Sequence, residues 1–277
     1  MEGDLDYNTA SIEELVDFCR ASAHRALPGS SHVIRLSQTT VAKFGTGVRQ
    51  AEADNQEVAF RLLNPHIVRI PQVFRFVKHQ IGPDTEEGYL IMEYIDGQAP
   101  KPDSYIDLTT RLLPILKQFR TIQSDIPGAL GGGPAYGIFW ENDFPKFSSR
   151  DEFDAWINKR LLNQRNSILG QSLSICHMDL APRNILELPD RSICLLDWAN
   201  AGFYPPVFEE VILRLQPAYN QEITFYESLA KSIFEDEAQL GSPTSISNRP
   251  PSLVRIVRRS GRKKRSSSNK AGIPKPI

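Results

Sequence analysis

Asp179, Asn184 and Asp197 are the residues of this chain whose types and spacing point most clearly to chemistry. Asn184 follows Asp179 by five positions, and Asp197 follows Asn184 by thirteen. An amide oxygen beside a carboxylate suits Mg²⁺, because this hard cation prefers oxygen ligands. The carboxylate of Asp179 is then free to accept a proton from a substrate hydroxyl. Taken singly, each residue is explained as a cap or a loop residue, but the three together favour a site.

A β-hairpin is the element expected to bring Asn184 and Asp197 together. Two short apolar runs, residues 185–188 and 193–196, flank a turn-forming Pro-Asp-Arg-Ser sequence. A turn centred on that sequence is symmetric for the two residues, so antiparallel pairing would set them face to face at its open end. His177 is expected to brace the preceding loop by hydrogen bonding, without a proton-transfer role.

The same stretch resembles the aminoglycoside phosphotransferase (APH) family. The likeness rests on HMDLAPRN at residues 177–184, LDW at 196–198 and AGFYP at 201–205, and it extends over residues 28–230. Within the family, the chain is most similar to the many fungal small-molecule-kinase-like members. The resemblance implies an α+β, protein-kinase-like fold of two lobes. The N-lobe would be a small antiparallel sheet with one helix, and the C-lobe would be mainly helical.

The chemistry implied by this resemblance is transfer of the γ-phosphoryl group of ATP to a hydroxyl of a small molecule. ATP and Mg²⁺ would be the cofactors. Asp179 would be the catalytic base, and Asn184 and Asp197 would bind the metal ion. A protein kinase is disfavoured, because the chain has neither Asp-Phe-Gly nor Ala-Pro-Glu.

Several departures from the family pattern support an alternative, a non-catalytic kinase-like binding or regulatory protein. Met178 stands where glycine is usual, and Ala199 follows Asp197-Trp198 where an acid is common. The nucleotide loop near residues 29–33 lacks a full Gly-x-Gly-x-x-Gly, and the carboxy-terminal substrate-binding helices are short.

A strand lysine is the expected partner of the nucleotide phosphates. Residues 32–36 and 39–44 are predicted to form paired strands. Lys43 lies in the second strand, within Val-Ala-Lys, the strand-lysine pattern of kinases. Alone, this pattern is more typical of a solvated lysine.

The acidic partner of Lys43 is expected on a helix over residues 50–63. Val58, Phe60, Leu62 and Leu63 are expected to face the core. Glu57 is preferred as the partner because its distance to the following Pro-x-Val strand resembles the family spacing, and Glu52 is the alternative. A surface pair with Arg61 would instead give Glu57 only a structural role.

The strand predicted over residues 89–94 ends at the segment expected to bind adenine. By resemblance to the family's hinge, backbone groups of Glu93, Tyr94 and Ile95 would hydrogen-bond the base, and Met92 would line its pocket. This recognition uses main-chain atoms, so the sequence does not decide between ATP and GTP. An ordinary buried strand ending at a turn is compatible with this role.

Four segments are expected along the chain. These are an N-terminal helical extension (1–27), a nucleotide-binding N-lobe (28–97), a helical C-lobe with the catalytic loop (98–240) and a basic disordered tail (241–277). Residues 130–134 are expected to form a flexible glycine-rich loop. Helices are predicted at 10–26, 106–122 with a break at Pro114, 148–169, 208–215 and 221–240.

Composition limits the remaining functional classes. No apolar run approaches the roughly 20 residues of a membrane span, and the three cysteines favour reduced, buried thiols in a cytoplasmic protein. The last 29 residues carry ten Lys and Arg and no acid, which leaves 22 bases against 33 acids, or −11, for the rest. That acidic body disfavours nucleic-acid binding. The tail is expected to be solvated, with nuclear import or an anionic surface as alternatives. A small-molecule acceptor is the expected partner, and no obligate protein partner is evident.

Overall fold

The computed structural model describes most of the chain. The basic segment 241–277 and the second half of the helix predicted to end at 169 lie outside the described residues. No described helix is long and apolar enough to cross a membrane. The described residues are 4–28, 30, 32–140, 143–160, 172–216 and 222–239, with side chains to 233.

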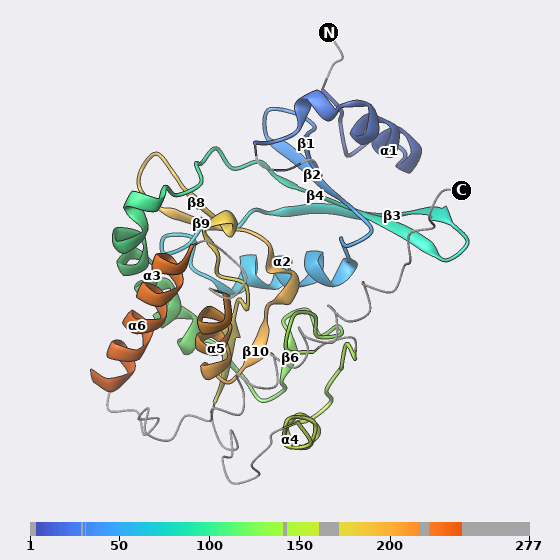
Figure 1. The fold of residues 1–277 in the computed structure, drawn as a ribbon. Coiled ribbons are helices and arrows are strands. Elements are labelled where there is room, and N and C mark those ends of the chain that lie inside the picture. Colours follow the sequence, from blue (N-terminus) through green and yellow to red (C-terminus); the bar gives the residue numbers. More distant parts are fainter. Residues whose placement is uncertain are drawn as a thin grey trace, which may run out of the picture.

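Four antiparallel strands form the N-lobe sheet, in the order β1-β2-β4-β3. They are β1 (Val33–Arg35), β2 (Thr40–Gly45), β3 (Val73–Gly82) and β4 (Thr85–Glu93). Val41 and Lys43 share one face of β2 because successive strand residues point to opposite faces. Val41 packs there with Ala53 of helix α2 (Gln50–Leu62). Lys43 is therefore directed to the side of the sheet that α2 covers (Figure 1).

Helix α1 (Ile12–Ala21) covers the other face of this sheet. Ser11 caps it, since the Ser11 hydroxyl accepts the N–H of Glu14 while the Glu14 carboxylate accepts the N–H of Ser11. Its apolar side packs against Ala42 and Ile91. The predicted helix to residue 26 is shorter than expected, because the chain turns into a 3₁₀ segment, η1 (Ala23–Arg25).

Four helices and a second small sheet make up the C-lobe (Figure 1). Helices α3 (Tyr105–Thr121), α4 (Arg150–Asn158), α5 (Val207–Leu215) and α6 (Ile223–Gln239) fall where the sequence predicts helices, and α3 continues through Pro114. The sheet, in the order β5-β7-β10-β6, was not predicted. Its strands are two to four residues long: β5 (Gln123–Ser124), β6 (Gly128–Ala129), β7 (Leu173–Cys176) and β10 (Gly202–Tyr204).

The predicted catalytic hairpin is present as β8 (Ile185–Glu187) and β9 (Ile193–Leu195). Its register differs by one residue from the expected one, since the N–H of Leu196, not of Asp197, bonds to Asn184 O at 2.9 Å. The cause is a three-residue loop at 189–191, closed by a hydrogen bond from Leu188 N–H to Ser192 O. In this loop Arg191 adopts a left-handed conformation (φ 68°).

Candidate active site

Lys43 lies between two carboxylates that come from different elements. Its Nζ is 2.5 Å from Glu52 Oε1 on α2 and 3.2 Å from Asp197 Oδ1, which follows β9. Burial alone would lower the pKa of Lys43, but the two carboxylates outweigh that effect and hold its pKa above the ordinary value. The ammonium is therefore charged and fixed at the point where the two lobes meet.

Glu57, the partner preferred from the sequence, is not the residue that Lys43 meets. Its side chain is not buried, whereas Glu52 is 3% exposed. Glu52 lies about one and a half turns earlier on α2, on the face that packs under the sheet. The alternative weighed from the sequence is thus the observed pairing, and the preference for Glu57 was wrong.

Asp179 lies at the centre of a hydrogen-bonded cluster. Arg183 donates to both of its carboxylate oxygens, at 2.7 and 2.8 Å, and Asn184 Nδ2 donates to Oδ2 at 3.0 Å. Gln216, at the end of α5, donates to Oδ1 at 3.2 Å. The side chain of Asp179 is 15% exposed, so it is held in one orientation while remaining open to a substrate.

Asn184 and Asp197 present oxygen atoms suited to a magnesium ion. Both hydrogen bonds from Asn184 Nδ2 go to Asp179, which leaves the amide oxygen outside these bonds. Asp197 adopts a left-handed conformation (φ 62°) at the start of η4 (Trp198–Asn200). Within the described residues there is no cluster of three or more His, Cys, Asp or Glu that could hold a metal by itself. Asn184 Oδ1 and the Asp197 carboxylate are the candidate ligands for Mg²⁺, which is usually bound by one or two carboxylates together with substrate phosphates.

Glu209 on α5 supports the loop that carries Asp179, and sequence reasoning missed it. Its Oε2 accepts the N–H groups of His177 at 2.6 Å and Met178 at 3.0 Å. These bonds hold Met178 at φ 66°, a left-handed conformation that is costly for a residue with a Cβ. Burial raises the pKa of Glu209 to about 7, against the opposing effect of the two N–H groups.

His177 braces the loop from the other side, as expected. Its Nε2 lies 3.0 Å from Leu196 O, so that nitrogen carries the proton. Full burial lowers the pKa of His177, which favours the neutral ring.

The segment expected to bind adenine leaves one N–H available. Glu93 N–H bonds to Gln72 O and Tyr94 N–H bonds to Thr39 O. Among the described residues the N–H of Ile95 has no such partner. Met92 is 9% exposed and packs with Val41 in the core below the sheet. The groups of this segment that remain as candidates for binding adenine are therefore Ile95 N–H and the carbonyl groups.

Asn55 connects the two lobes next to the Lys43 site. Its Nδ2 donates to Trp198 O at 3.0 Å, and its Oδ1 accepts the N–H of Gly131 at 2.8 Å. Asn55 is completely buried. A Cβ on Gly131 would lie 2.5 Å from Asp54 Cβ, so only glycine allows this approach. The glycine-rich loop, expected to be flexible, thus packs against α2.

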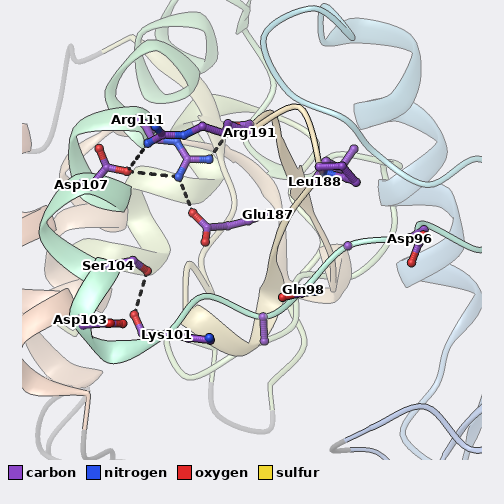
Figure 2. A pocket seen from close by; sticks show the side chains of 13 residues that line it. Asp96, Gln98, Lys101, Asp103, Ser104, Asp107, Arg111, Glu187, Leu188 and Arg191 are labelled. Carbon is purple, nitrogen blue, oxygen red and sulfur yellow. Dashed lines mark hydrogen bonds and ion pairs between the residues drawn. The ribbon is translucent and has the colours of Figure 1, made fainter.

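Two pockets flank the site. A small one of about 100 Å³ borders Asp179. A larger one, of about 630 Å³, lies beyond the hinge, between residues 96–101, the start of α3 and the β8–β9 loop. Figure 2 shows Arg111 there, bound to Asp107, Glu187 and the backbone of Arg191. This larger pocket includes none of the predicted site residues.

A sequence profile described as "APH: Phosphotransferase enzyme family" matches residues 28–232. The chain therefore belongs to the phosphotransferase enzyme family, as the motifs around Asp179 indicate. No curated protein gives a significant match.

Solved structures agree in fold. An apo thermostable mutant of the aminoglycoside phosphotransferase APH(4)-Ia is 12% identical, with a TM-score of 0.54, and 85% of each chain is covered. APH(4)-Ia itself gives 12% identity and a TM-score of 0.52 over 87% of this chain and 90% of that one. A ternary complex of a further thermostable mutant with AMP-PNP and hygromycin B gives 12% and 0.51 over 85% and 81%. The α+β, kinase-like fold predicted from the sequence is confirmed.

Proposed function

We propose that this protein transfers the γ-phosphoryl group of ATP to a hydroxyl of a small molecule, with Mg²⁺ as the metal. The observation that carries the proposal is the contact of Lys43 with both Glu52 and Asp197, beside Asn184 and Asp179. Family membership supports the same reaction class. The similar APH(4)-Ia structure with AMP-PNP and hygromycin B is consistent with nucleotide use.

Each residue has a role in the proposed reaction. Lys43 binds the nucleotide phosphates, and Asn184 and Asp197 would hold Mg²⁺, which neutralises charge on those phosphates. Asp179 orients the acceptor hydroxyl and receives its proton. The acceptor oxygen bonds to the γ-phosphorus while the bond from that phosphorus to the β–γ bridging oxygen breaks, and ADP leaves.

Arg183 acts on this chemistry through Asp179. Its two hydrogen bonds hold both carboxylate oxygens, and its charge offsets that of Asp179 before a proton arrives. Burial would lower the pKa of Arg183, but Asp179 outweighs burial and raises it. The guanidinium therefore keeps its charge throughout turnover.

Calorimetric titration with ATP, with and without Mg²⁺, tests the proposal. Wild-type protein is expected to bind ATP in a Mg²⁺-dependent way, and Asp197→Ala is expected to lose that dependence. Asp84→Ala, in the exposed β3–β4 turn, is the matched control and is expected to bind as wild type does. A folded wild-type protein that binds no nucleotide would instead support the non-catalytic alternative.

A further inference from the structure

The small pocket beside Asp179 is the place where an acceptor hydroxyl can reach the proposed base. Its walls are Met178 and Asp179 of the catalytic loop, Ile212, Leu215 and Gln216 of the α5 end, and Ile138 and Asn200 opposite. Lys43 is not among the described lining residues of this pocket.

The volume of this pocket limits what enters it. A cavity of about 150 Å³ accommodates benzene, so a pocket of about 100 Å³ takes a group of about four non-hydrogen atoms. A tert-butyl or short branched aliphatic group has this size. A whole aminoglycoside ring does not fit.

The walls of the pocket are held in place. Met178 is fixed by Glu209, and Ile212 and Leu215 lie on the same face of α5, three residues apart. Asn200 contacts Gly137, where an added Cβ would come within 3.1 Å of Asn200 Cγ. Ile212 and Leu215 are buried, so this side of the pocket is not expected to move for a larger acceptor, whereas Ile138 is partly exposed.

Four of the seven described lining residues are apolar (Ile138, Met178, Ile212 and Leu215), and the polar ones are Asp179, Asn200 and Gln216. Asp179 is the one carboxylate among these residues, and Arg183 already pairs with it. The described lining has no aromatic ring to receive a quaternary ammonium group. An ammonium group placed among the four apolar side chains would lose its hydration, and the one carboxylate of the described lining is already paired with Arg183.

We infer that the acceptor is an uncharged alcohol whose hydroxyl meets Asp179 and whose small aliphatic group fills this pocket. The inference rests on the proposed function and adds the class of acceptor. In this proposal Ile138 limits the size of the acceptor group. Asn200 is the position at which an added charge would change the preference for uncharged acceptors.

Two acceptors of the same shape separate charge from size. Choline and its uncharged carbon isostere, 3,3-dimethylbutan-1-ol, differ in a single atom. With the full chain, ATP and Mg²⁺, the isostere is expected to give a kcat/KM roughly tenfold or more above that of choline. Kanamycin, a polycation, is expected to give no transfer.

Asn200→Asp tests the role of charge. A second carboxylate beside the pocket is expected to reduce the isostere-to-choline ratio by about tenfold, through attraction of the ammonium. Asn64→Asp, at an exposed position just beyond the end of α2, is the control and is expected to leave the ratio unchanged.

Ile138→Ala tests the role of size. Ile138 is 39% exposed, so its truncation is not expected to prevent folding. The kcat/KM of a bulkier uncharged alcohol, cyclohexylmethanol, is expected to rise about tenfold relative to the isostere. Ile106→Ala, at a 69% exposed position of α3, controls for loss of the side chain itself.

Titration with ATP and Mg²⁺ keeps the two proposals distinguishable. If the wild-type protein shows no Mg²⁺-dependent ATP binding, the proposed function is overturned. If that binding is present, transfer to choline or kanamycin above the isostere overturns the acceptor inference. The acceptor inference is also overturned if no uncharged alcohol is phosphorylated. It is overturned as well if the acceptor preference is the same as in wild type in both Asn200→Asp and Ile138→Ala.

Discussion

Glu52 is a buried carboxylate whose principal partner is the Lys43 ammonium. Burial raises its pKa, and Lys43 is the principal group that opposes this effect. The pair therefore depends on both members, because removing one leaves the other buried and unpaired. Replacing Glu52 is therefore expected to weaken nucleotide binding, because Lys43 would lose the partner that positions it.

Glu52→Gln is expected to weaken Mg²⁺-dependent ATP binding by about ten- to a hundredfold, because Lys43 loses its negatively charged partner on α2. Lys43 would then turn toward Asp197, its second partner. Glu57→Gln, on the other side of the same helix, is the matched variant and is expected to bind ATP as wild type does. Calorimetry measures ATP binding by both variants. Equal weakening in Glu52→Gln and Glu57→Gln would contradict the assignment of Glu52 as the partner of Lys43.

Helix α2 connects the Lys43 site to the lower lobe. Glu52 and Asn55 lie three residues apart, so they share a face, and Asn55 is bonded to the backbone just after Asp197. The helix thus fixes the position of a carboxylate and, through Asn55, of the loop that carries the proposed metal ligand.

Asn55→Ala is expected to lower the free energy of unfolding by about 1–3 kcal/mol, because Trp198 O and Gly131 N–H lose a buried partner. The loop that carries Asp197 also loses its hydrogen bond to Asn55, so Mg²⁺-dependent ATP binding is expected to fall about tenfold. Ile115→Ala, a buried residue of α3, destabilises the fold away from the site and serves as the comparison. Thermal unfolding is expected to show that both variants are less stable, and calorimetry measures their ATP binding. A positioning role for Asn55 requires that ATP binding is weaker in Asn55→Ala but not in Ile115→Ala.

The same helix shows where sequence reasoning succeeds and where it fails. Its bounds were predicted closely, yet Phe60 and Leu62, expected in the core, are 42% and 43% exposed. The buried face instead contains Glu52, Asn55 and Gln56, whose polar groups bond to Lys43, to Trp198 O and to Pro71 O, respectively. Apolar periodicity therefore misplaced Phe60 and Leu62, although Leu63 is buried as expected. Glu57 was preferred on its resemblance to the family spacing, and that criterion pointed to the wrong glutamate.

Residues of the catalytic segment were predictable because their chemistry is local in sequence. Asp179, Asn184 and Asp197 lie in one stretch and were found together. Glu209 was missed because its partners are backbone N–H groups more than thirty residues away. Two adjacent acids within an otherwise apolar helical pattern, Glu209 and Glu210, were the available signal.

The stability of the whole molecule is expected to depend on pH through Glu209. Its pKa of about 7 in the folded protein exceeds the ordinary value of 4.5. Between these values the folded state binds more protons than the unfolded chain, so stability is present at low pH and is lost as pH rises through about 7. The contribution is up to about 3 kcal/mol.

Glu209→Gln is expected to remove this part of the pH dependence, because glutamine accepts hydrogen bonds but does not titrate in this range. Thermal unfolding between pH 5 and 8 measures the slope. Glu13→Gln, at an exposed position of α1, is expected to keep the wild-type slope. An identical slope in Glu209→Gln would show that another group is responsible.

Residues 95–97 connect the two lobes, and the chain is anchored by hydrogen bonds on either side of them. Tyr94 N–H is bonded to Thr39 O in the sheet, and Gln98 exchanges two backbone hydrogen bonds with Glu187 of the hairpin. Gly97 has no room for a side chain, because a Cβ there would lie 2.9 Å from Leu186 Cβ. Within this link, residues 95–97 are therefore the part left to bend if the lobes open. Since a closed enzyme releases its product only when it opens, bending of this short link is expected to pace turnover.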